Sequence, residues 1–238
     1  MRLDKLMEKH ACGSRGQVNM LLRRKQVTVD GIVVTDAGKI VDSSLQKIMV
    51  SGKELCHFGG KYWLLNKPSG VVTARKDDQH KTVIDCLSQK DRDDALYPVG
   101  RLDRDTEGLV FLTTNGPIGF RMLHPKHHVT KEYYVEVNGR LGSDASVFFS
   151  KGVAFLDGTV CKPAQLNVIA SDESFSKAQI IISEGKFHQI KKMFLAYGVK
   201  VTYLKRTHFG PFSLGELAVG EYRELTLEEK EDLKAYFD

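Results

Sequence analysis

The sequence predicts an α/β protein of 238 residues that combines a small basic N-terminal module with a larger, nearly neutral part. Charge placement is the first observation. Residues 1–60 carry ten Lys and Arg against six Asp and Glu, whereas residues 61–238 carry 25 against 24. The second is a Gly-Gly pair at 59–60, which follows a polar stretch and marks a break in the chain. We therefore expect two domains, at 1–58 and 59–238, each with helices and strands.

Composition limits the class of protein. A hydrophobic content of 42% is enough for a packed core. The N-terminus has no apolar signal region and no apolar run could span a bilayer, so we expect a cytoplasmic protein without a membrane partner. The four cysteines form no Cys-x-x-Cys pair, and His124, His127 and His128 have no Cys or carboxylate at ligand spacing beside them. We expect no metal site, no disulfide framework and, because no Gly-x-Gly-x-x-Gly or Walker-type loop occurs, no nucleotide cofactor.

The basic module contains two predicted helices followed by short strands. Leu3, Leu6 and Met7 are at helical spacing, and Ser14-x-x-Gln17 is a capping box that opens a second helix. Residues 27–34 read as a hairpin with an Asp-Gly turn at 30–31, and residues 48–50 as a further strand. Basic modules of this kind favour polyanions, nucleic acid above all.

This arrangement resembles the S4 RNA-binding module. The matching segments are the opening Arg2 to Lys5, the Ser14-Arg15 helix start, and Val27 to Gly31. In that family the second helix and the strand after it face RNA. The resemblance implies RNA contacts by six basic side chains of this module, namely Arg2, Lys5, Arg15, Arg23, Arg24 and Lys25.

The larger part alternates between predicted strands and helices. Strands are predicted at 62–66, 71–73, 109–114, 131–137, 164–169, 177–182 and 199–206. Helices are predicted after Thr82 as cap, at 118–124, within 141–156, at 187–197 with Gly198 at the end, and after a capping box at 226–229. Of the adjacent Tyr133 and Tyr134, one must face the core and the other must face away, because side chains alternate along a strand.

A short polar run at 100–108 precedes the strand at 109–114. It holds three carboxylates and two arginines, and Asp103 lies between Arg101 and Arg104. A fixed position and a charged neighbourhood are what a nucleophilic or basic carboxylate needs. Spacing alone leaves a second interpretation open, namely a charged surface loop with an ion pair.

Four segments carry a more specific resemblance. They are residues 66–70, residues 100–116, Lys131-x-Tyr133, and residues 184–193. In this order behind an S4 module, the chain resembles the bacterial ribosomal RNA pseudouridine synthases, in the branch named after the small-subunit enzyme RsuA. The resemblance implies a mixed, mostly antiparallel sheet flanked by helices and crossed by a cleft. It also implies isomerisation of a uridine within RNA, without cofactor or metal.

The resemblance also assigns roles to residues. Asp103 corresponds to the nucleophile, Tyr133 to the aromatic residue that stacks on the target base, and Lys191 to the basic partner of the aspartate, with Lys186 as the second candidate. Further RNA contacts are implied for Arg101, Lys186, His188 and Gln189. The chain departs from the usual pattern at Lys186, where Arg is common, and at Asn115, where Asp is common.

We therefore predict an rRNA pseudouridine synthase that acts as a monomer on 16S rRNA or on a small-subunit assembly intermediate. Two alternatives stay open on the sequence. One is the same reaction on 23S rRNA. The other is a non-catalytic RNA-binding assembly factor, against which the intact set of Asp103, Tyr133 and Lys191 argues.

Overall fold

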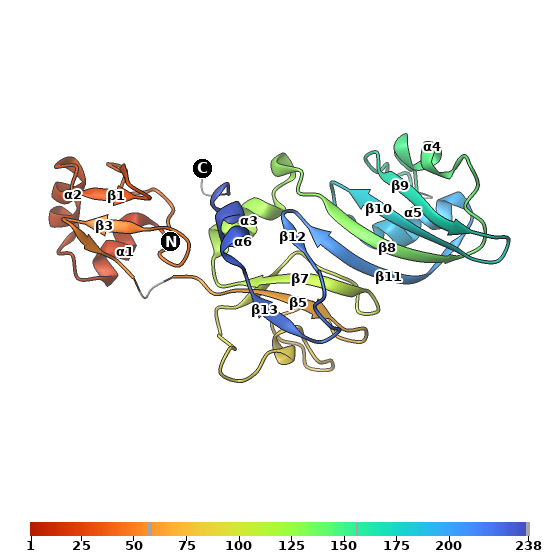
Figure 1. Ribbon diagram of the computed structural model, residues 1–238, viewed down its shortest axis with the longest axis horizontal. Coiled ribbons are helices and arrows are strands. Elements are labelled where there is room, and N and C mark those ends of the chain that lie inside the picture. The colour runs from red at the N-terminus through yellow and green to blue at the C-terminus, as the bar shows by residue number, and fades with distance from the viewer. Residues whose placement is uncertain (57–58, 156, 237–238) are drawn as a thin grey trace. The chain divides into compact units, whose positions relative to one another are not determined.

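The computed structural model describes residues 1–56, 59–155 and 157–236 (Figure 1). These residues form two compact units. The first unit contains residues 1–62, 113–121 and the segment from 225 onward, and the second contains residues 63–112 and 122–224. The expected domain boundary at 58 falls on residues 57–58, which lie outside the described ranges. No helix in the described ranges is long and apolar enough to cross a membrane.

The N-terminal part of the first unit has the predicted helices and hairpin. Both reciprocal bonds of the Ser14–Gln17 capping box are present at the second helix. Asp30 and Gly31 have φ values of 49° and 82°, which suit the two-residue turn of a hairpin. Within residues 1–56 the helices are α1 (Leu3–Lys9) and α2 (Arg15–Arg23), and the sheet has the order β2 (Ile32–Val33), β1 (Val27–Val29), β3 (Ile48–Val50), β4 (Lys53–Glu54).

A buried hydrogen-bond cluster in the first unit explains the asparagine at position 115. Asp42 accepts hydrogen bonds from the Tyr62 hydroxyl at 2.6 Å and from Asn115 Nδ2 at 2.8 Å. Asn115 also donates to the Tyr62 oxygen at 2.9 Å. Burial and the Asp42 charge raise the pKa of Tyr62. An aspartate at position 115 would bring a second negative charge to this buried cluster, whereas the amide supplies the donors that Asp42 and Tyr62 need.

The same unit contains two helices from later in the chain. These are α3 (Gly116–Leu123), most of which belongs to this unit, and α6 (Leu227–Lys234). The predicted capping box at Thr226 is formed, since its side chain accepts from the backbone N–H of Glu229. Arg121 donates to the backbone carbonyl of Tyr236 at 2.6 Å.

A mixed sheet forms the centre of the second unit. Within the described ranges, its main path runs β13 (Tyr222–Glu224), β5 (Tyr62–Lys67), β7 (Glu107–Thr113), β11 (Lys200–Phe209), β8 (Lys131–Asn138), β10 (Ser176–Ile182), β9 (Gln165–Ser171), with β12 (Phe212–Ser213) on β11 and β6 (Tyr97–Val99) on β7. The β7–β11 pair is parallel, whereas β11–β8, β8–β10, β10–β9 and β13–β5 are antiparallel. The predicted mixed, mostly antiparallel sheet is therefore confirmed.

Helices cover one end of this sheet. Figure 1 shows α4 (Ala145–Ser150) and α5 (Gln189–Tyr197) near strands β9 and β10, and α4 contacts β9 while α5 contacts β11. Phe149 of α4 and Phe194 of α5 are fully buried, and their ring centroids are 4.7 Å apart. This contact closes the core beneath the loop that precedes α5.

Three predicted elements differ from the structure. Residues 71–73 form no strand; Val72 makes a single bridge to Thr82, and the helix expected after Thr82 is one 3₁₀ turn, η1 (Ile84–Cys86). The helix expected from 187 begins at Gln189, because His188 adopts a left-handed conformation with φ 54° that an α-helix cannot include. A second 3₁₀ turn, η2 (Pro125–His127), follows α3.

Candidate active site

A cleft of about 1450 Å³ lies within the second unit and gathers the predicted catalytic residues. Its walls include the polar loop at 100–106 and the loop at 183–191, which precedes and enters α5. Its floor includes Tyr133 of β8 and Leu204 of β11. Asp103, Tyr133 and Lys191 therefore share one cavity, although Asp103 and Lys191 are 88 residues apart in the sequence.

The backbone on either side of Asp103 is held in place. The Thr73 hydroxyl donates to the Leu102 carbonyl at 2.8 Å and lies 3.2 Å from the Leu102 nitrogen, from which it accepts. On the other side, the Arg104 carbonyl accepts from Lys67 Nζ at 3.0 Å and from the Gly70 nitrogen at 2.8 Å. These bonds restrain both neighbours of Asp103, so the position of its carboxylate in the cleft is fixed by the turn that follows β5.

Lys191 is the cation closest to Asp103. Its Nζ is 3.1 Å from Asp103 Oδ2, and His188 Nε2 is 3.7 Å from Asp103 Oδ1. The same amine donates to both oxygens of Asp105, at 2.7 and 2.9 Å. Burial disfavours the charge on Lys191, but the hydrogen bonds that its amine donates to Asp105 and Asp103 outweigh this effect and raise the pKa of Lys191. The amine is therefore a permanent positive charge between two carboxylates.

Tyr133 faces the cleft from the sheet. It is only 6% exposed and belongs to the same core cluster as Ile190 and Leu204. Tyr134, its neighbour, is on the opposite face of β8, where its hydroxyl donates to Glu136 at 2.7 Å. The expected inward and outward alternation is present, and the inward residue is the one the sequence assigned to base stacking.

The predicted RNA contacts are in different environments. In the second unit, Arg101 is exposed at the cleft, Lys186 Nζ contacts Glu184 at 3.6 Å, and Gln189 is buried with its amide bonded to Glu184 and to the Lys186 nitrogen. In the first unit all six basic residues are exposed: Arg2, Lys5, Arg15, Arg23, Arg24 and Lys25. Arg2 pairs with Asp4 at 2.8 Å and Lys5 with Glu8 at 2.7 Å. Their contacts with RNA stay predictions.

Sequence reasoning missed three residues that shape this site. Asp105 received no role from the sequence, and in the structure its largely exposed carboxylate accepts hydrogen bonds from Lys191. Lys67 is fully buried and donates to three backbone carbonyls, and burial lowers its pKa to about 8 despite the nearby carboxylates, Asp105 first among them. A lysine that ends an apolar strand before a proline was the available signal for Lys67. For Thr73, the third of these residues, the sequence contained no such signal.

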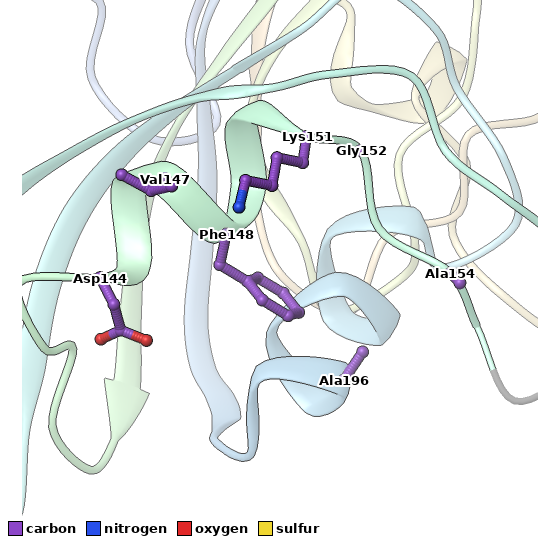
Figure 2. A pocket seen from close by; sticks show the side chains of 7 residues that line it. All are labelled: Asp144, Val147, Phe148, Lys151, Gly152, Ala154 and Ala196. Atoms are coloured by element: carbon purple, nitrogen blue, oxygen red, sulfur yellow. The ribbon is translucent and has the colours of Figure 1, made fainter.

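Two further observations concern metal binding and a second hollow. Among the described residues, no cluster of three or more His, Cys, Asp or Glu could hold a metal ion. A smaller hollow of about 500 Å³ lies between α4 and α5 (Figure 2), with Phe148 pointing toward α5. Its carboxylate, Asp144, accepts a hydrogen bond from Tyr197 at 2.8 Å. None of the predicted site residues lines this hollow.

The cleft thus holds a restrained carboxylate, Asp103, beside an amine, Lys191, on a mixed sheet. Residues 61–196 match the RNA pseudouridylate synthase family, and residues 1–46 match the S4 domain. The chain is 40% identical to a ribosomal small subunit pseudouridine synthase A of Yersinia pestis and 38% identical to an uncharacterized RNA pseudouridine synthase, YtzG, of Bacillus subtilis, each over 96% of both chains. A crystal structure of a pseudouridylate synthase matches with a TM-score of 0.67 at 32% identity, covering 98% of this chain and 99% of that one.

The chain therefore belongs to the RNA pseudouridylate synthases. It is an isomerase with an N-terminal S4 domain.

Proposed function

We propose that this enzyme converts a uridine of 16S rRNA into pseudouridine, with Asp103 as the nucleophile and no cofactor. The observation that carries the proposal is the convergence of Asp103, Lys191 and Tyr133 on one cleft. The choice of small-subunit RNA is supported by the relative from Yersinia pestis, whose name specifies the ribosomal small subunit. We further propose that the enzyme acts as a monomer in the cytoplasm, on rRNA or on a small-subunit assembly intermediate.

The reaction uses the carboxylate in its ionised form. Asp103 attacks C1′ of the target nucleotide, and the bond between C1′ and N1 of uracil breaks. The base turns, C5 bonds to C1′ as the bond between C1′ and the Asp103 oxygen breaks, the proton on C5 leaves, and N1 gains a proton. Every other atom stays within the nucleotide, so the reaction needs no second substrate. Lys191, 3.1 Å from Asp103, favours the anionic carboxylate that the attack requires.

Tyr133 has a different role in this proposal. A base inside structured RNA must leave its stack before C1′ becomes accessible, at a cost of about a few kcal/mol. An aromatic ring that receives the base recovers part of that cost by stacking. Tyr133 is buried in the same core cluster as Ile190 and Leu204, so its ring is in place before RNA binds.

Substitution of the nucleophile tests the proposal. Asp103→Asn removes the negative charge but keeps the size of the side chain, so we expect no detectable release of tritium from 16S rRNA labelled at C5 of uridine. Asp172→Asn is the control, because Asp172 is an exposed carboxylate in the turn between β9 and β10 and does not line the cleft. Full turnover by Asp103→Asn would overturn the assignment. Turnover on 23S rRNA alone would overturn the choice of substrate.

A further inference from the structure

A second group of charged residues lies in the cleft and has no part in the reaction described above. Arg206 of β11 lines the cleft but is only 1% exposed. Its Nε donates to the Leu109 carbonyl at 2.7 Å, and its Nη2 has no hydrogen-bond partner among the described residues. A guanidinium is always charged in proteins, and a buried charge without a counterion is costly.

Lys131 is a second cation on the same part of the sheet. In the register of β8 and β11, Tyr133 is opposite Arg206, and Lys131 is opposite Phe209. Lys131 and Tyr133 are two residues apart on one strand, so both side chains are on the same face. The Phe209 ring centroid is 4.9 Å from Arg206 Cζ and 5.7 Å from Lys131 Nζ. Arg206, Lys131 and Tyr133 all line the cleft.

Neither cation is neutralised by the protein. Lys131 Nζ donates to the Val129 carbonyl at 2.9 Å, and no carboxylate of the described residues forms an ion pair with Lys131 or Arg206. Burial and, to a smaller extent, the charge of Arg206 lower the pKa of Lys131 to about 8, against the opposing effect of Glu184. Glu184 itself is engaged with the Lys162 nitrogen and with Gln189. The positive charges of Lys131 and Arg206 thus repel each other in a partly buried environment.

We infer that Lys131 and Arg206 bind a phosphodiester group of the RNA substrate, beside the base that Tyr133 receives. An anion offsets both charges at once, whereas an uncharged ligand would leave them uncompensated. Arginine suits phosphate oxygens through its fork of N–H donors, and lysine adds a point charge. Because Arg206 is directly across from Tyr133, the phosphate belongs to the target nucleotide or its neighbour. The assignment of this anion to an RNA phosphate rests on the proposed function, whereas the anion site itself does not.

Inorganic phosphate is the probe for the site itself. We would titrate it into the full-length protein by calorimetry, with Lys131→Gln, Lys131→Arg and Arg206→Lys as variants. Losing one charge-assisted contact should weaken phosphate binding about tenfold in Lys131→Gln, while Lys131→Arg retains it. Arg206→Lys keeps the charge at a buried position, loses the fork, and should bind with intermediate affinity. Lys177→Gln is the control, since this lysine is on β10 outside the cleft, next to Glu136.

Kinetics on 16S rRNA then decide whether the anion is the substrate's phosphate. Lys131→Gln should raise KM about tenfold at unchanged kcat, because the lost contact is present before and during the reaction. The slope of log affinity against log salt should fall by about 0.7, as for one lost phosphate contact on a single strand.

If Lys131→Gln bound phosphate as tightly as the wild type, the anion site would be overturned. Unaltered KM with weakened phosphate binding would overturn the RNA assignment. If the wild type isomerised no rRNA, the proposed function would fail while the titration still decided the site.

Discussion

Lys67 bonds directly to the loop that contains Asp103. Its amine is fully buried and donates to the carbonyls of Pro68, Val71 and Arg104, at 2.9, 2.8 and 3.0 Å. The last of these follows Asp103 directly in the chain. Burial lowers the pKa of this amine to about 8, so it loses its proton at a lower pH than an exposed lysine does.

The buried lysine should give folding stability a distinct pH dependence. In the folded protein Lys67 loses its proton near pH 8, whereas in the unfolded chain it does so near pH 10.5. Between these values the unfolded state binds more protons, so stability rises with pH, by up to about 1.4 kcal/mol per pH unit. Below pH 8 Lys67 is protonated in both the folded and the unfolded state, and its contribution to stability is constant.

Lys67→Met should remove the contribution of Lys67 to the slope of unfolding free energy against pH, measured by urea unfolding between pH 8 and 10. Lys177→Met, at an exposed lysine, should leave the slope unchanged; an unchanged slope in Lys67→Met would contradict the prediction.

The residue scale also shows what the sequence could predict. Asp103 and Lys191 were assigned by the family resemblance of the short segments that contain them, and the structure places them 3.1 Å apart. Lys186 was a candidate for the same role, but its amine contacts Glu184 instead. The hydrogen bonds of Asp105 to Lys191 and of Thr73 to Leu102 link positions 86 and 29 residues apart. Such pairs depend on how loops meet in space, which local spacing does not encode.

Among the elements, β7 and β11 approach each other unusually closely at Gly108. A Cβ atom built there would be 2.2 Å from the Arg206 carbonyl oxygen, and the residue has φ 102°. Both facts require glycine. The close approach brings β11, with Leu204 and Arg206, beside the strand that follows the Asp103 loop.

Gly108→Ala should therefore destabilise the protein strongly. A side chain would strain the backbone and push against backbone atoms of β11 that have no room to move, so we expect a loss of about 3 kcal/mol or more in urea unfolding. Gly185→Ala is the matched control, because a Cβ there meets nothing within 4 Å and the backbone is not left-handed. Equal stabilities of the two variants would show that the strands can separate without cost.

The elements were predicted best where a local signal was strong. Capping boxes at Ser14 and Thr226 and the Asp30-Gly31 turn identified their elements correctly. The segment at 71–73 was assigned to a strand on its apolar and β-branched residues, but the Thr73 hydroxyl bonds to Leu102 and the segment makes only one bridge. The early helix start at 187 failed because His188 takes a left-handed conformation that its sequence neighbours do not require.

At the scale of the whole molecule, two features prepare the enzyme for a polyanion. The S4 part presents Arg23 and Arg24 at the exposed end of α2, and the second unit presents Arg101 at its cleft. The charge asymmetry of the sequence anticipated the first of these. Nothing in composition indicated the second, because residues 61–238 are almost neutral overall.

Removal of the α2 charges should weaken RNA binding in a salt-dependent manner. We expect Arg23→Ala combined with Arg24→Ala to lower the slope of log affinity against log salt by about 1.4, as for two lost phosphate contacts. The defect in binding a labelled 16S rRNA transcript should thus be larger at low salt than at high salt. Lys90→Ala with Arg140→Ala removes two exposed charges of the second unit outside the cleft and serves as the control. Wild-type affinity of the α2 variant at both salt concentrations would refute these contacts.

The parallel pairing of β7 with β11 also has a consequence for how the chain acquires activity. The register pairs Glu107 with Lys205 and Gly108 with Arg206, so the paired residues are almost a hundred positions apart in the sequence. Contacts of such long range require a large loop to close first and are slow to form. During synthesis, Asp103 leaves the ribosome long before β11 exists, and the floor of the cleft is incomplete until then. A nascent or truncated chain that ends before β11 lacks Leu204 and Arg206 of the cleft, so we expect it not to isomerise uridine.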